Sequence, residues 1–151
     1  MTEATKRQAL KADTELKIFP KGDLISSPNF TGAAWLQRLM TDADKFDVVI
    51  SNVVFDPGVR NSWHSHPGGQ ILIATSGKGY YQERGKPVQI LNAGDVVAIP
   101  SNVVHWHGAA PDSEFIHIAI NTKVSLGSAV WYEKVTDEEY SKILNPLKIF
   151  R

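Results

Sequence analysis

The amino-acid sequence predicts an all-β fold, in which a single domain forms a β-sandwich or barrel. After Thr31, short apolar segments alternate with groups of turn residues such as Asp56-Pro57-Gly58, Gly85-Lys86-Pro87 and Asn92-Ala93-Gly94-Asp95. Many short strands with turns about every 8–12 residues are typical of sandwiches and barrels. A chain of 151 residues is long enough to bury one hydrophobic core, which favours one domain.

Three segments are predicted along the chain. Residues 1–30 form a polar N-terminal extension that ends in the Pro/Gly/Ser-rich stretch FPKGDLISSPNF, with room for a short strand at Glu15–Phe19. Residues 31–135 form the barrel. Its predicted strands are 32–40, 46–55, 70–76, 79–84, 88–91, 95–99, 103–108, 114–121 and 128–133, and a turn at Gly77-Lys78-Gly79 separates the third from the fourth. Residues 136–151 are predicted to be helical, because Thr136 and Glu139 have the spacing of a capping box.

Composition excludes several classes of function. With 16 basic and 16 acidic residues, the chain has no charge excess that would favour nucleic acid or an anionic membrane. It has no cysteine, so any metal site must use nitrogen and oxygen ligands. The N-terminus lacks the apolar core of a signal peptide, and no apolar run has membrane-spanning length. We therefore expect a cytoplasmic protein that acts on a small molecule.

The five histidines lie close together in the chain. His64, His66, His105, His107 and His117 all lie in or beside predicted strands. Alternate residues of a strand share a face, so the HSH pair and the HWH pair each point two imidazoles the same way. An isolated histidine is usually a hydrogen-bonded core or surface residue. The clustering of all five counts against that interpretation and favours a metal site.

At these residues the chain resembles the cupin superfamily. The first cupin motif, G-x5-H-x-H-x3-E-x6-G, matches Gly58, His64, His66 and Gly77, with Gln70 at the Glu position. The second motif, G-x5-P-x-G-x2-H-x3-N, matches Gly94, Pro100 and His105, with Asn102 and Ala109 at its second Gly and its Asn. Asn accepts a positive φ better than most residues, so the change at Asn102 is mild. The resemblance implies a jelly-roll-like barrel and four metal ligands, namely His64, His66, Gln70 and His105.

A narrower resemblance covers residues 46–140. The strings PGVRNSWHSHPGGQ, GDVVAIP, HWHGAAP, HIAI and VTDEEY are similar to a group of small bacterial manganese cupins that includes the cupin-type hydroxynitrile lyases. That group also has Gln at the Glu position. A second group with this Gln acts on ketouronates, and its similarity is confined to the ligand pattern. Manganese is therefore the expected metal, while Fe, Ni and Zn remain open because the ligand set suits them too.

The amide ligand has a chemical consequence. Three neutral imidazoles and a neutral amide leave the 2+ charge of an ion uncompensated, which makes it a stronger Lewis acid than one bound by a carboxylate. The 3+ state is not stabilised either, so dioxygenase chemistry is disfavoured.

Proton transfer needs a further group. His117 is the expected general base, and His107 is expected to orient a ligand or to act as a second acid/base, although the roles can be exchanged. The predicted substrate pocket is lined by residues on inward faces, and no Arg or Lys falls clearly on them, which disfavours a polyanionic substrate such as a ketouronate. The expected lining residues are Ser51, Val53, Phe55, Leu72, Ala74 and Asn121.

Three functions remain open at this point. The first is a metal-dependent lyase resembling the hydroxynitrile lyases, in which the metal acts on a hydroxyl or carbonyl oxygen and a pocket histidine removes the proton. The second is another metal-assisted lyase or isomerase, or a hydrolase, acting on a small hydroxy or keto compound, for example an acid. The third is a non-catalytic binding cupin, because fold alone does not decide function. Cupin barrels commonly associate, so a homo-oligomer (a dimer or tetramer) is expected, and the N-terminal extension could cross to a neighbouring subunit.

Overall fold

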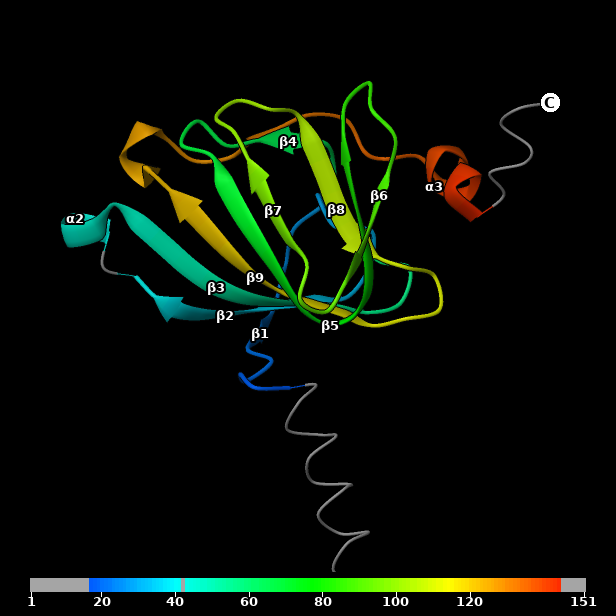
Figure 1. Ribbon diagram of the computed structural model, residues 1–151, viewed down its shortest axis with the longest axis horizontal. Coiled ribbons are helices and arrows are strands. Elements are labelled where there is room, and N and C mark those ends of the chain that lie inside the picture. The colour runs from blue at the N-terminus through cyan, green and yellow to red at the C-terminus, as the bar shows by residue number, and fades with distance from the viewer. Residues whose placement is uncertain (1–16, 42, 145–151) are drawn as a thin grey trace, which may run out of the picture.

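The computed structural model describes residues 17–41 and 43–144, and its strands form a curled sheet (Figure 1). The strand order is β1-β2-β3-β9-β5-β8-β4-β10, and β6 and β7 also pair with β5. The strands are β1 (Asp23–Leu24), β2 (Ala34–Met40), β3 (Val48–Phe55), β4 (His64–Ser65), β5 (Gln70–Glu83), β6 (Gln89–Asn92), β7 (Val96–Ile99), β8 (His105–Ala109), β9 (Phe115–Thr122) and β10 (Val130–Trp131). The helices are α2 (Ala43–Phe46), α3 (Asp137–Leu144) and the short 3-10 helix η1 (Val124–Leu126). The predicted all-β fold with a short C-terminal helix is confirmed.

Strand β5 joins the two layers of the curled sheet. Its first half pairs with β7 and β9, and its second half pairs with β6 and β8. The predicted turn at Gly77-Lys78-Gly79 is wrong, because the chain continues there as one strand. Its register shifts between Ala74 and Ser76, and Gly77 has a φ of 75°, so the turn-forming glycines bend the strand around the barrel corner. A side chain at Gly77 would collide with the carbonyl oxygen of Glu114.

Two hydrophobic clusters lie on opposite sides of the sheet. The inner cluster fills the barrel and includes Phe55, Leu72 and Phe115. The outer cluster contains Trp63 and Trp106 together with Val135 and Tyr140 of the C-terminal segment. Alternate residues of a strand face opposite sides, so Trp106 of β8 lies on the face opposite His105 and His107, and its ring centroid is 6.2 Å from that of Tyr140 in α3.

The secondary structure predicted for the two ends of the chain can be compared with the structure only in part. Helix α3 begins with the predicted capping box, since the Thr136 N–H donates to Glu139 Oε1 and the Glu139 N–H donates to Thr136 Oγ1, both at 3.0 Å. Residues 145–151, which were also predicted to be helical, lie outside the described residues. The short strand expected at 15–19 is partly outside them too; its described part, residues 17–19, is not a strand, and the first strand is β1. None of the helices in the described ranges is long and apolar enough to cross a membrane.

Candidate metal centre and cavity

Three strands bring the predicted ligands together. His64 lies on β4 and His66 just after it, Gln70 begins β5, and His105 begins β8. His64 and His105 are direct cross-strand partners. The nitrogen atoms that His64, His66 and His105 can offer lie within 4.8 Å of one another. These three histidines could therefore hold one metal ion.

The loop of the second motif also contacts the first. Asn102 has a φ of 66°, the left-handed conformation that the motif glycine would supply, and its N–H donates to the His66 carbonyl oxygen at 2.9 Å. This hydrogen bond ties the loop before His105 to the loop that carries His66.

Backbone carbonyl groups fix the orientation of two of the rings. His64 Nδ1 lies 2.8 Å from the Ser62 carbonyl oxygen, and His105 Nδ1 lies 2.9 Å from that of Val103. A carbonyl oxygen only accepts, so in both rings Nδ1 carries the proton and donates. In each neutral ring Nε2 is left as a lone-pair donor, the form in which histidine binds metals. His66 Nε2 is buried and has no hydrogen-bond partner among the described residues.

The amide of Gln70 presents its oxygen to the same place. Gln70 Nε2 donates to Asn121 Oδ1 at 2.9 Å, so Gln70 Oε1 faces His105 Nε2 at 3.3 Å. Neither of these two atoms carries a proton, and two lone pairs repel unless a cation lies beside them. The donor set of three imidazole nitrogens and one amide oxygen fits a divalent transition metal.

Burial keeps the cluster neutral. It lowers the pKa of His64 well below its ordinary value, with His105 adding repulsion, and lowers that of His66 to about 4. The pKa of His105 is also lowered by burial, against the opposing effect of its hydrogen bond to Val103. Neutral imidazoles are the metal-binding form, so the ligands are ready at neutral pH.

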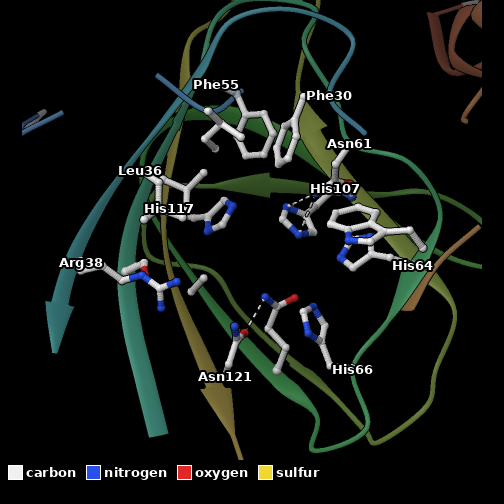
Figure 2. Close-up of a pocket in the computed structure, with 16 residues that line it drawn as sticks. Phe30, Leu36, Arg38, Phe55, Asn61, His64, His66, His107, His117 and Asn121 are labelled. Carbon is white, nitrogen blue, oxygen red and sulfur yellow. Dashed lines mark hydrogen bonds between the residues drawn. The ribbon is translucent and has the colours of Figure 1, made fainter. Parts of the chain in front are cut away.

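The two remaining histidines lie beside the cluster and differ in their contacts (Figure 2). The ring of His107 is 5.4 Å from that of His64 and 4.8 Å from that of His117. Asn61 accepts the backbone N–H of His107 at 3.0 Å, and its amide nitrogen lies 3.1 Å from His107 Nε2. By contrast, both ring nitrogens of His117 are buried without a well-formed hydrogen bond to any described residue.

Both of these histidines are neutral as well. Burial lowers the pKa of His107 well below its ordinary value, with His117 next in effect. Burial also lowers the pKa of His117 to about 4, although the nearby backbone of Ile118 favours the protonated ring slightly. Neither histidine therefore has the ordinary histidine pKa of about 6.5.

A cavity of about 130 Å³ opens beside the cluster, similar in size to an engineered cavity of about 150 Å³ that binds benzene. Four of the predicted pocket residues line it, namely Ser51, Val53, Phe55 and Asn121. Leu72 and Ala74 do not line it; both are buried members of the inner core. His64, His66, Gln70, His107 and His117 also line the cavity, whereas His105 is fully buried behind them.

Several lining residues were not identified from sequence. Phe30 and Trp131 form an aromatic wall, with their ring centroids 6.2 Å apart, and the Trp131 ring lies 4.6 Å from that of His64. They come from outside the motif region, and only the tertiary structure brings them to it. Asn61 was missed because its partner His107 is 46 residues away.

Arg38 also lines the cavity, which corrects the expectation that no Arg or Lys would face inward. The sequence argument missed Arg38 because it did not determine which residues of β2 face the interior of the barrel. Residues two apart in a strand share a face, so Arg38 lies on the same face as Leu36 and the buried Ala34. This alternation was the signal that could have identified it.

Comparison with known proteins agrees with this geometry. A cupin domain model matches residues 51–120. The chain is 41% identical over 113 residues to an (R)-mandelonitrile lyase of Granulicella tundricola, covering 75% of this chain and 86% of that protein. It is 60% identical to a cupin-like protein of Thermotoga maritima, with a TM-score of 0.81 over 83% of this chain and 96% of the other. A DMSP lyase from Ruegeria pomeroyi, 19% identical with a TM-score of 0.60 over 87% of this chain and 69% of the other, shares the fold alone. The histidine cluster, the curled sheet and these similarities show that the chain belongs to the cupin family.

Proposed function

We propose that this protein is a metal-dependent lyase that, like the hydroxynitrile lyases, acts on a hydroxyl or carbonyl oxygen of a small substrate. The observation that carries the proposal is the pair of unprotonated atoms, His105 Nε2 and Gln70 Oε1, facing each other at 3.3 Å beside two further imidazoles. A divalent ion held by His64, His66, Gln70 and His105 would supply Lewis-acid polarisation of the substrate oxygen. The 41% identity to a mandelonitrile lyase supports cleavage of a cyanohydrin as the reaction class.

Side chains of the protein would accept the proton of the substrate hydroxyl. Neither ring nitrogen of His117 has a hydrogen-bond partner among the described residues, and the ring lines the cavity, so its unprotonated nitrogen can accept the hydroxyl proton. His107 is held at two points by Asn61 and suits a positioning role between His117 and the ligand His64. Phe30, Phe55 and Trp131 would enclose the apolar part of the substrate and exclude water.

Metal analysis and an activity assay together test this proposal. Protein purified without chelator should contain about one divalent ion per chain, with manganese as the expected metal, and should release cyanide from an aromatic cyanohydrin. His64→Ala and His105→Ala should lose the ion and the activity, while His107→Asn should keep most of the ion. Full metal content in both ligand variants would show that the site is wrongly assigned. A stoichiometric ion without cyanohydrin cleavage would instead favour a different metal-assisted reaction, or a binding role.

A further inference from the structure

Arg38 is the only charged side chain among the described residues that line the cavity. No Asp or Glu lines the cavity with it, and none of the described residues forms an ion pair with it. Asp23 and Arg38 both line a second groove on the neighbouring surface, but no ion pair joins them. An unpaired guanidinium at the wall of a cavity that also holds a cation site makes the interior positive.

The strand register places Arg38 relative to the histidines. In one row across three strands, Leu36 pairs with Val53, which pairs with His117. In the next row Arg38 pairs with Ser51, which pairs with Ala119, and Asn121 lies two residues further along β9. Arg38 is therefore one inward-facing position beyond the His117 row, and β2 lies two strands, or about 10 Å, from β9.

The side chain is directed into the cavity. Figure 2 shows the guanidinium of Arg38 pointing toward the side bounded by His117 and Asn121, opposite His64 and His66. The pairing of β2 with β3 shifts in register between Arg38 and Met40. Such irregularities re-aim side chains and are frequent beside functional sites. The residue is exposed, so a ligand can reach it from solvent.

We propose that Arg38 forms a carboxylate-binding subsite, and that the small substrate carries a carboxylate in addition to, and separated from, the hydroxyl or carbonyl oxygen that reacts. Arg binds carboxylates through two parallel N–H donors, which fixes orientation as well as charge. The reacting oxygen lies at the histidine end, the carboxylate lies at Arg38, and the apolar wall formed by Leu36 and Val53 contacts the carbon chain between them. This inference rests on the proposed function for the histidine end and adds the substrate class.

Binding of matched acid and amide ligands tests the subsite. The probes are 4-oxopentanoate and its uncharged amide, titrated calorimetrically into the as-purified protein and into chelator-treated protein. We expect the wild type to bind the acid about tenfold more tightly than the amide, with a preference that weakens as salt is added. Arg38→Gln should reduce the ratio of the two dissociation constants to about one. Lys134→Gln removes the same charge from an exposed residue that does not line the cavity, and should leave the ratio unchanged.

The outcomes separate this proposal from the function on which it rests. Equal affinity for acid and amide in the wild type, or an unchanged ratio in Arg38→Gln, would overturn the subsite. An Arg38→Gln protein that keeps its ratio but forms larger assemblies would show that the charge protects the edge of β2, which also overturns it. If the preference depends on Arg38 while chelation changes neither affinity, the subsite stands and the role of the metal fails. If chelation weakens both ligands equally without any acid preference, the metal role stands and the subsite fails.

Discussion

Replacement of His117 by Leu should change how the stability of the metal-free protein depends on pH. Burial lowers the pKa of His117 to about 4 in the folded protein, whereas the unfolded chain has the ordinary value of about 6.5. Below pH 6.5 the unfolded state therefore binds more protons than the folded state. The stability that the neutral buried ring retains at pH 7 is lost progressively as the pH falls from about 6.5 to about 4.

The size of the effect follows from linkage. One pKa unit corresponds to about 1.4 kcal/mol, and pH 5 lies about 1.5 units below the unfolded value, so His117 should lower the free energy of unfolding by about 2 kcal/mol between pH 7 and pH 5. Leu cannot titrate and has a similar size. The free energy of unfolding of His117→Leu, relative to wild type, should thus rise by about 2 kcal/mol over this interval. The variant should also be at least as stable as wild type at pH 7, because a buried unsatisfied polar group costs about 1–3 kcal/mol.

Urea unfolding of chelator-treated protein at pH 7 and pH 5 measures the change, with the slope of each transition checked for constancy. Phe115→Leu is the matched control, because Phe115 is fully buried on the same strand and the substitution removes no titratable group. Its effect on stability should be the same at both pH values. If the free energies of unfolding of His117→Leu and wild type also differ by the same amount at pH 7 and pH 5, the ring does not have the low pKa inferred from its burial.

Three further predictions concern the metal-loaded protein. Gln70→Glu should keep the ion and lower lyase activity at matched metal loading, because a carboxylate neutralises the cation; equal or greater turnover would refute the Lewis-acid argument. Asn121→Leu should weaken metal affinity about 10–100-fold in an equilibrium competition with a chelator, because the Gln70 amide loses the acceptor that orients it. Asn121→Asp should retain the metal affinity, because a carboxylate can still accept the hydrogen bond from Gln70 Nε2. If this variant also loses metal affinity, Gln70 is oriented the other way, with its oxygen toward residue 121. His117→Ala should retain the ion and lose about 10²–10⁴-fold in rate. In the wild type, the acid limb of the rate profile should lie well below pH 6.5, because burial and a nearby cation both disfavour the protonated ring; a limb near 6.5 would contradict the burial of the base.

The sequence by itself determined the fold class, the site region and the ligand candidates. Turn residues at short intervals predicted the strands, and alternation along HSH and HWH predicted which rings share a face. Both are local properties, because turn conformation and side-chain direction depend on neighbouring residues. For the same reason, the capping box at Thr136 and Glu139 was predictable, since its two hydrogen bonds span three residues.

The tertiary structure decided what depends on contacts between distant segments. The local pattern showed glycines at Gly77 and Gly79, but only the packing of Glu114 and Phe115 against them shows a bent strand instead of a turn. The pairing of β2, β3 and β9 brings Arg38 to the same cavity as His117, although 79 positions separate them in the chain. Burial, which sets the pKa of His117, arises from the whole inner core. Chain folding alone decides which groups lose their contact with water, and so the charge of the cavity and the protonation of its histidines could not be obtained from local sequence.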